Sequence, residues 1–298
     1  MTGQRVAITG ASGLIGGALS AFLSARGDDV LHLVRRPART LAEISWDPAK
    51  QTLDPASLEG VDAVVHLAGA GVADHRWTPA YKQLILSSRA DGTATVARAV
   101  SQHGSAIRLV SGAAIGVYGS DRGDEVLTEE SQPGEGFLVD VVRAWEAATE
   151  AAVAAGAPVA TSRTGLVMAR GAGAFEPLVR LGRFGLAGPL GSGRQYWSWI
   201  SLEDTVRALA HLVDHRDITG PVNVVGPQPL RQREVVQEIG RQLGRPTLLP
   251  APPIAIRVAL GEFAAEVLGS QRVRAAVLER TGFTYRQRTL PEAVATIV

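Results

Sequence analysis

Gly10, Gly13 and Gly16 stand three residues apart, where an apolar β-type run passes into a helical pattern. In this context Gly10 permits a tight turn, Gly13 lets the backbone approach a pyrophosphate, and Gly16 lets the helix pack close to the strand. The N–H groups and the positive dipole at the helix N-terminus favour phosphate oxygens. We therefore predict a dinucleotide-binding turn rather than an ordinary tight turn. The cofactor contacts expected here are Thr9, Gly10, Ser12, Gly13, Leu14 and Ile15.

Two arginines after the next β-type run bear on the choice of cofactor. The run Val30–Val34 ends in Arg35 and Arg36. An acidic residue at this point favours NAD, whereas a guanidinium pairs with the 2′-phosphate of NADP. The sequence thus predicts NADP(H), with Arg35 or Arg36 on that phosphate; the alternative is a solvated pair of charges. Trp46 either flanks the adenine or is a core aromatic beside a turn-forming Asp47.

The elements that position these residues alternate between strand-like and helical patterns. The expected strands are Val6–Thr9, Val30–Val34, Ala63–Leu67, Ile107–Ser111 and Val159–Arg163, and the expected helices are Ile15–Ala25, Lys82–Ala99, Leu138–Ala154, Glu203–Asp214 and Arg231–Leu243. Such alternation predicts an α/β fold, a Rossmann-type doubly wound parallel sheet. Ligands bind beyond the carboxyl ends of its strands. The residues at those ends, expected to line one cleft, are Leu67, Ala68, Gly69, Ser111, Thr164 and Gly165.

The sequence changes in character near residue 165. We expect residues 1–165 to form the dinucleotide-binding domain, with room for later segments to complete its sheet and helices. Residues 166–298 are expected to form a smaller substrate lobe. This lobe contains a glycine-rich stretch at Gly171–Gly193, a proline-rich crossing at Pro246–Pro253 and a terminal unit at about 250–298.

Composition limits the class of protein and its partners. The chain has 298 residues, 46% of them apolar and 20% charged, which suits a folded protein with a sizeable core. A formal net charge of +1 gives no electrostatic reason to expect a nucleic-acid or membrane partner. The chain has no cysteine and its six histidines lack metal-ligand spacing, so we predict no metal. No signal peptide or bilayer-spanning run is apparent, which makes a cytoplasmic protein the expectation.

Several motifs resemble the extended, atypical branch of the short-chain dehydrogenase/reductase superfamily. The glycine spacing is of the extended kind, His66-Leu67-Ala68-Gly69 resembles the segment after its fourth strand, and Asp91-Gly92-Thr93 resembles the helix that follows. Within that branch the chain is similar to the NAD-dependent epimerase-like group that carries its own C-terminal domain. The matching pieces are Arg76-Trp77, Ser88-Arg89, Gly116-Val117-Tyr118-Gly119, Ala144-Trp145-Glu146, Arg163-Thr164-Gly165, Gly191–Gln195, Ser198-Trp199-Ile200, Gly220–Asn223, Leu260-Gly261-Glu262, Ser270–Val273 and Gly282-Phe283.

The resemblance implies a catalytic serine, tyrosine and lysine, but this sequence departs from that pattern. In the superfamily the lysine and the nicotinamide ribose lower the tyrosine pKa, so that the phenol can move a proton during hydride transfer. With Glu146 as the anchor on the same helix, Leu138 occupies the tyrosine position and Val142 the lysine position. Ala113 stands where the serine is expected. A standard tyrosine-dependent oxidation or epimerisation is therefore not expected.

Other residues are the remaining candidates for chemistry and for substrate binding. Ser111 and Tyr118 are the catalytic candidates; the alternatives are a local hydrogen bond for Ser111 and plain packing for Tyr118. Arg89 stands where extended members often carry an asparagine, and its five donors suit a cofactor or substrate anion. The alternative for Arg89 is an ion pair with an acid such as Glu146. The substrate-binding candidates are Arg89, Tyr118, Gln195 and Trp199, with the core of the second lobe as the alternative for the tryptophan.

These observations predict an NADP(H)-binding oxidoreductase that acts on a small molecule, with a non-standard proton donor or none. One alternative is a non-catalytic NADP(H)-binding sensor or regulatory protein. Another is a nucleotide-sugar epimerase or dehydratase, which needs a general base that the sequence does not offer. Related folds often dimerise through the helices after the fourth and fifth strands, which leaves a homodimer open.

Overall fold

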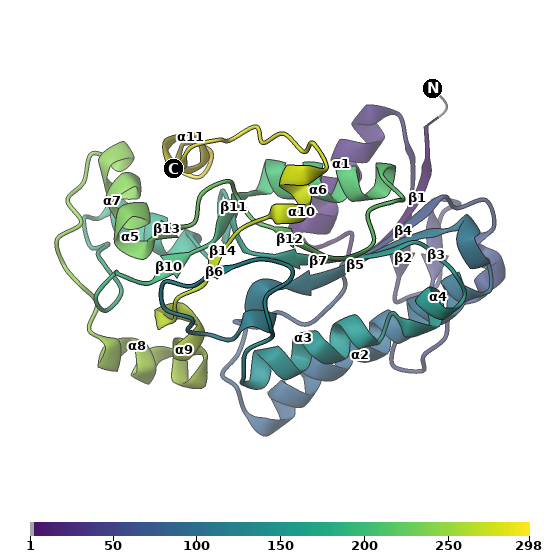
Figure 1. Ribbon diagram of the computed structural model, residues 1–298, viewed down its shortest axis with the longest axis horizontal. Coiled ribbons are helices and arrows are strands. Elements are labelled where there is room, and N and C mark those ends of the chain that lie inside the picture. Colours follow the sequence, from purple (N-terminus) through teal and green to yellow (C-terminus); the bar gives the residue numbers. More distant parts are fainter. Residues whose placement is uncertain (1–2) are drawn as a thin grey trace.

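A parallel sheet forms the centre of the computed structural model, which describes residues 3–298 (Figure 1). The strand order is β12-β7-β5-β4-β1-β2-β3, and every neighbouring pair runs parallel. The strands are β1 (Arg5–Thr9), β2 (Asp29–Val34), β3 (Glu43–Ser45), β4 (Ala63–His66), β5 (Arg108–Ala114), β7 (Val159–Thr164) and β12 (Gly220–Val224). The order reverses between β1 and β4, which makes their carboxyl ends the expected ligand crevice. The predicted Rossmann-type α/β fold is thus confirmed.

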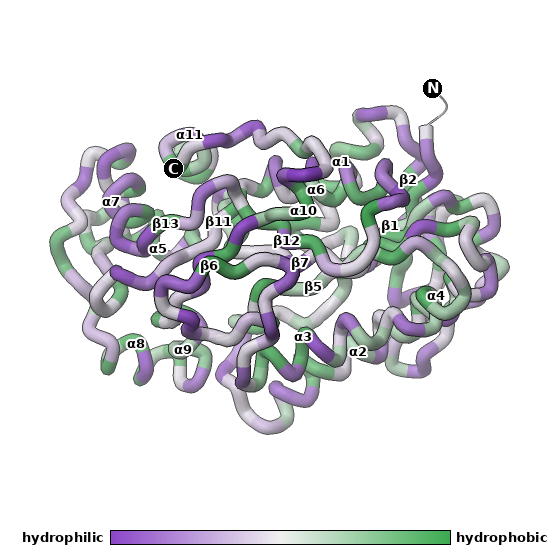
Figure 2. Tube along the Cα trace, viewed as in Figure 1, coloured by the Kyte–Doolittle hydropathy of each residue, from purple (hydrophilic) through white to green (hydrophobic). Residues whose placement is uncertain are grey.

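Helices cover both faces of this sheet. α1 (Leu14–Arg26) and α6 (Leu202–Asp214) lie on one face, and α2 (Pro79–Ser101), α3 (Phe137–Ala147) and α4 (Glu150–Ala154) lie on the other (Figure 1). The strands between the two layers are buried on both sides, and Val6, Ala7 and Ile8 of β1 have no exposed surface. Figure 2 shows the same layering, with hydrophobic segments in the sheet and hydrophilic ones along the outer helices.

The smaller lobe packs around its own core. Its longer helices are α5 (Glu176–Arg183), α7 (Gln232–Leu243), α8 (Pro253–Leu260) and α11 (Leu290–Ala295). Its core contains Phe175, Trp197 and Trp199. The short elements of the chain are η1 (Pro55–Leu58), η2 (Gly104–Ala106), η3 (Ile115–Tyr118), β6 (Val126–Leu127), β8 (Leu166–Ala169), β9 (Ala172–Gly173), β10 (Tyr196–Trp197), β11 (Trp199–Ser201), β13 (Leu230–Arg231), η4 (Gly261–Phe263), α9 (Ala264–Leu268), β14 (Arg272–Val273) and α10 (Ala276–Arg280).

Two predicted boundaries differ from the structure. The expected helix Leu138–Ala154 is divided into α3 and α4, because the Thr149 hydroxyl donates to the carbonyl of Glu146 at 2.7 Å and the chain turns there. The expected strand Ile107–Ser111 continues to Ala114 in β5. The division at residue 165 stays a prediction, and it allows later segments to complete the sheet. β12 returns from the second half of the chain and pairs with β7 at the sheet edge, with Val222 opposite Ser162.

No helix within residues 3–298 has both the length and the apolar character that crossing a membrane requires.

The close approach of α1 to β1 yields a prediction about stability. A Cβ on Gly16 would lie 2.2 Å from the carbonyl oxygen of Gly10, whereas a Cβ on Gly17 would lie 3.3 Å from the nearest such atom. We expect Gly16→Ala to lower the free energy of unfolding by about 1–3 kcal/mol, because the backbone of the turn must shift. Urea denaturation measures this, with Gly17→Ala as the matched control. Equal stability of the two variants would contradict the close approach.

Candidate functional site

The β1–α1 turn has the geometry that the glycine spacing predicts. Gly10 has a φ of +71°, and a Cβ there would lie 3.0 Å from the backbone nitrogen of Ala68. The Gly13 N–H donates to the Gly10 carbonyl at 2.9 Å, and Gly13 caps α1 without a side chain. The first turn of α1 carries no acidic residue. Its N–H groups and positive dipole are therefore available to an anion.

A buried hydroxyl ties this turn to the segment after β4. The Thr9 Oγ1 accepts hydrogen bonds from the N–H groups of Leu67 at 3.0 Å and Ala68 at 3.1 Å. These two bonds use both of its lone pairs, so its proton goes to His66 Nδ1, 2.8 Å away. His66 is fully buried, and desolvation lowers its pKa to about 4, which keeps the ring neutral at pH 7. Thr9 and His66 thereby fix both walls of the crevice.

The two arginines after β2 have different surroundings. The Arg36 guanidinium donates two hydrogen bonds to the Glu43 carboxylate, at 2.6 and 2.8 Å, and a third to the Pro37 carbonyl. These bonds hold the pKa of Glu43 at about 2. Within residues 3–298 no hydrogen bond or ion pair engages the Arg35 guanidinium, which is exposed. Of the two predicted phosphate ligands, Arg35 is therefore the one with a free guanidinium.

Trp46 belongs to the core rather than to an open adenine site. Its side chain is 5% exposed and meets the His66 ring edge-on at a centroid distance of 5.8 Å. Asp47 accepts hydrogen bonds from the N–H groups of Ala49 and Lys50, so it forms the turn that follows. The first of the two interpretations of Trp46, an aromatic beside the adenine, is corrected to the second.

Arg89 lies beside the segment after β4, and within residues 3–298 it forms no ion pair with an acid. Its Cγ and Cζ are 3.4 Å from the place where a Cβ on Gly69 would stand, and its Cζ is 5.0 Å from the centre of the Trp145 ring. The guanidinium donates to the carbonyl of Ile85 at 3.1 Å, and burial lowers its pKa. The alternative ion pair with Glu146 is excluded, because Glu146 binds a different arginine. Arg89 is thus a half-buried cation at the crevice with donors to spare.

The expected reaction centre is lined by apolar groups. Leu138 packs against Gly116, and Val142 is 2% exposed, so neither position of the usual catalytic pair can move a proton. Ser111 lies in the middle of β5, which runs three residues past the expected strand end, and is fully buried; its hydroxyl donates to the carbonyl of Gly112 at 3.2 Å. That local bond is the alternative stated for Ser111, and its catalytic role stays a prediction.

Tyr118 has a structural environment instead of contact with an open cleft. The side chain has no exposed surface. Its hydroxyl donates to Asn223 Oδ1 at 2.8 Å and accepts from the guanidinium of Arg163 at 3.1 Å. Burial raises its pKa, against the opposing influence of Arg163. This environment fits the packing alternative stated for Tyr118, and its roles as proton donor and substrate contact stay predictions.

This hydroxyl is the midpoint of a buried polar chain that joins distant segments. Glu146 binds Arg163 through two hydrogen bonds, at 2.7 and 2.9 Å. Asn223 donates onward to the carbonyl of Arg274, and its own N–H donates to Glu129 Oε1. The chain of contacts runs from α3 through β7 and η3 to β12 and the C-terminal unit. Glu129 and Asn223 had no predicted role, although Asn223 ends one of the matching motifs.

The remaining predicted residues lie around the second lobe. Thr164 and Gly165 stand at the end of β7, and a Cβ on Gly165 would lie 2.4 Å from the carbonyl oxygen of Ser198. Trp199 is 1% exposed in the core of the lobe, which fits the alternative stated for it, and its substrate contact stays a prediction. Gln195 is 7% exposed, and its amide donates to the carbonyl of Leu190 at 3.0 Å. The structure thus does not bring Gln195 and Trp199 to one open surface.

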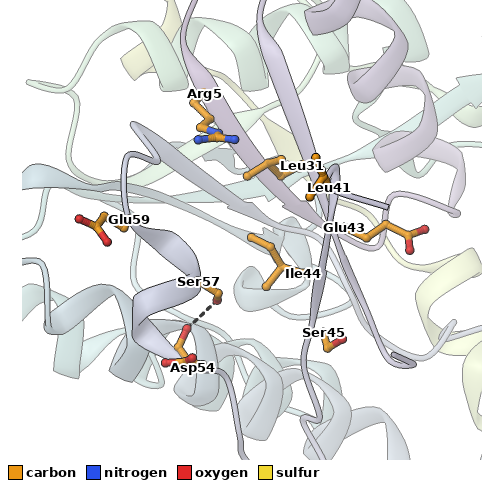
Figure 3. A pocket seen from close by; sticks show the side chains of 9 residues that line it. All are labelled: Arg5, Leu31, Leu41, Glu43, Ile44, Ser45, Asp54, Ser57 and Glu59. Atoms are coloured by element: carbon orange, nitrogen blue, oxygen red, sulfur yellow. Dashed lines mark hydrogen bonds between the residues drawn. The ribbon is translucent and has the colours of Figure 1, made fainter. Parts of the chain in front are cut away.

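A separate hollow of about 410 Å³ lies beside β3 and η1, away from the glycine turn (Figure 3). Its lining residues are Arg5, Leu31, Leu41, Glu43, Ile44, Ser45, Asp54, Ser57 and Glu59. Arg5 begins β1, whereas the candidate crevice lies where β1 ends. Within residues 3–298, this hollow included, no group of three or more His, Asp or Glu side chains could hold a metal.

The neutral state of His66 predicts a pH dependence of stability. An unfolded histidine has a pKa near 6.5, so between about pH 6.5 and 4 the unfolded chain binds a proton that the folded chain rejects. We expect the free energy of unfolding to fall by about 3 kcal/mol as the pH decreases through this range. Denaturation of wild type and of His66→Gln across this pH range gives the contribution of His66 as the difference between their free energies of unfolding. His75→Gln, at an exposed position, is the control. If the free energy of unfolding depended on pH in the same way for wild type and His66→Gln, the predicted contribution of His66 would be contradicted.

The environment of Tyr118 predicts a loss of stability without a loss of cofactor affinity. Tyr118→Phe leaves an Arg163 N–H and the Asn223 oxygen without their shared partner, which costs about 1–3 kcal/mol. We expect urea denaturation to show this loss while the dissociation constant for NADPH is unchanged. Tyr285→Phe, which removes a single bond to the carbonyl of Val225, is the matched control and should lose less. Unaltered stability in Tyr118→Phe would refute the structural role.

Comparisons with known proteins agree with this geometry. The model of the "NAD dependent epimerase/dehydratase family" matches residues 6–226, and the model of a domain of unknown function, DUF1731, matches residues 251–297. "Epimerase family protein Mb2239" of Mycobacterium bovis is 43% identical over 295 residues, which cover 99% of this chain and 97% of that protein.

Solved structures show the same similarity. The crystal structure of human epimerase family protein SDR39U1 (isoform 2) with NADPH has a TM-score of 0.88 and 30% identity, and covers 99% of both chains. The nucleoside-diphosphate sugar epimerase of Corynebacterium glutamicum has a TM-score of 0.82 and 34% identity; the match covers 99% of this chain and 58% of that one. The chain therefore belongs to the NAD-dependent epimerase/dehydratase family and carries that family's NAD(P)-binding short-chain dehydrogenase/reductase fold together with a DUF1731 domain.

Proposed function

We propose that this protein binds NADPH and transfers its hydride to a small molecule without a tyrosine proton donor. The observation that carries the cofactor assignment is the free guanidinium of Arg35 at the end of β2, beside a glycine turn with no competing acid. A 2′-phosphate gives Arg35 the charged partner that it lacks. The similar human protein SDR39U1, solved with NADPH, supports the same choice.

The residues present fit a dinucleotide. A side chain on Gly10 or Gly16 would collide with backbone, so the turn stays tight and its N–H groups remain open to the pyrophosphate. Leu67, Ala68 and Gly69 pass beside the turn, held by the Thr9 hydroxyl. Arg89 stands against Gly69 with unused donors, which suits an oxygen of the cofactor or a substrate anion. Bound NADPH supplies the hydride, and these groups bind and orient it.

The apolar surroundings of the expected reaction centre favour one second candidate, a non-catalytic NADPH sensor. The apolar side chains of Leu138 and Val142 cannot protonate an alkoxide, and the buried Tyr118 hydroxyl already donates its proton to Asn223. Nicotinamide absorbance, followed with a panel of carbonyl and enone compounds, separates the two candidates. Turnover that depends on Ser111 or Arg89 supports the enzyme, whereas tight NADPH binding without turnover across the panel supports the sensor.

The position of Arg35 predicts the cofactor preference. We expect Arg35→Ala to raise the dissociation constant for NADPH about 10- to 100-fold and to leave that for NADH unchanged, because only NADPH carries the 2′-phosphate. Arg36→Ala should have a smaller effect, since Glu43 already neutralises that guanidinium. Fluorescence titration measures both constants. Arg39→Ala, an exposed arginine nearby, is the control for a simple change of charge. If Arg35→Ala and Arg36→Ala both keep the preference, the assignment fails.

A further inference from the structure

A second hollow, of about 270 Å³, lies between the loop after η3 and the smaller lobe and shares no residue with the cofactor crevice. It is an open depression bordered by the loop after η3, the segment before β10, the end of β13 and the end of α9. Its lining residues are Asp121, Gly123, Asp124, Ser192, Arg194, Gln195, Arg231, Leu268 and Ser270. Polar and charged groups predominate, so a polar ligand suits it better than an apolar one.

One arginine of this hollow is held rigidly. Arg231 donates two parallel hydrogen bonds to the carboxylate of Asp124, at 2.8 and 2.9 Å, and a further one to the carbonyl of Arg194. Its Cζ lies 3.9 Å from the centre of the Tyr196 ring. A guanidinium fixed by a carboxylate, a carbonyl and an aromatic face loses little further freedom when a ligand binds.

Two more arginines stand around the same carboxylate without partners of their own. Arg272 lies over the Tyr196 ring at 4.9 Å, and Arg194 lines the hollow. Within residues 3–298 neither side chain forms an ion pair or a hydrogen bond. The hydrogen bonds of Arg231, with the charges of Arg231, Arg272 and Arg194, lower the pKa of Asp124. Arg194 and Arg231 line the hollow, Arg272 stands behind the Tyr196 ring, and the carboxylates of Asp121, Asp124 and Glu234 lie around them.

The floor of the hollow is polar and fixed. Ser270 is 5% exposed; its hydroxyl accepts from the Tyr196 N–H and donates to the carbonyl of Gly123. The amide nitrogen of Gln195, also buried, donates to Leu190. These bonds hold the segments that carry Arg194 and Tyr196 in place. The position of the Arg231 guanidinium thus exists before any ligand arrives, which reduces the cost of binding.

We propose that this hollow binds the carboxylate or phosphate group of a small molecule through Arg194, Arg231 and Arg272. Guanidinium groups match such oxyanions in charge and shape, and an oxyanion relieves the mutual repulsion of the three arginines. The site is independent of the NADPH assignment, because it uses different residues on different elements. Asp124 competes with the ligand for Arg231 and so limits its affinity.

Calorimetric titration of the protein saturated with NADPH tests the proposal, because the cofactor then occupies the other phosphate-binding residues. Citrate and inorganic phosphate are the probes, and they distinguish a carboxylate site from a phosphate site. We expect saturable binding of at least one probe, weakened at least tenfold in Arg194→Ala and in Arg272→Ala. Arg194→Ala removes an exposed side chain without bonds, so it should fold even if Arg272→Ala does not. Arg241→Ala, which removes a paired surface arginine, is the control and should bind normally.

A change in the opposite direction sharpens the test. Asp124→Asn removes the competing charge and should tighten binding of the probe several-fold, whereas Glu130→Gln, an exposed acid with the same change of charge, should not. Equal affinity of wild type and Arg194→Ala for the probe would overturn the proposal. The same heat of binding from chloride at equal ionic strength would also overturn it. NADPH affinity, measured in the same variants, should be unchanged. A failure of NADPH binding would count against the proposed function and not against this site.

Discussion

The buried ion pair between Glu146 and Arg163 is the interaction on which the arrangement of the two lobes depends. Their side chains are 20% and 9% exposed, so both ions have lost most of their water. Such a pair is stable only when its remaining hydrogen-bonding groups are also satisfied. Tyr118 and Asn223 supply that continuation and extend it to the C-terminal unit. Removal of one member would leave a buried charge or donor without a partner.

The presence or absence of a carboxylate partner distinguishes arginines with structural roles from arginines that can bind a ligand. Arg163 and Arg36 bind carboxylates with two hydrogen bonds each, and their charge is already neutralised. For Arg163, burial alone would lower the pKa, but Glu146 raises it. Arg35 and Arg89 have no carboxylate within the described chain, and both lie at the crevice where β1, β2 and β4 end. A cation without an acid at the ligand edge of a parallel sheet is better explained by a bound anion than by stability.

The sequence predicts the local parts of this site well, because they depend on short-range geometry. Gly10 needs a positive φ and Gly16 needs an absent Cβ, and both requirements are visible in the glycine spacing. The roles of Tyr118 and Trp199 could not be predicted in this way. Tyr118 meets Asn223, which is 105 residues away, and whether a hydroxyl faces a cleft or a partner depends on that long-range contact. The helix break at Thr149 could not be predicted from the sequence either, because an alanine-rich stretch favours a continuous helix.

The absence of a proton donor restricts what a bound hydride donor can do. Hydride addition to a carbonyl creates an oxyanion, which in the superfamily pattern takes its proton from the tyrosine. Here Leu138 and Val142 occupy those positions, and the Tyr118 hydroxyl is engaged on both sides. The developing charge can then be met only by fixed donors such as the Arg89 guanidinium, or by water. Under the proposed function, an acceptor that delocalises the negative charge formed by hydride addition, such as an enone, therefore suits this crevice better than a simple ketone. The proposed hydride acceptor is therefore one that has to be oriented by the protein rather than protonated by it.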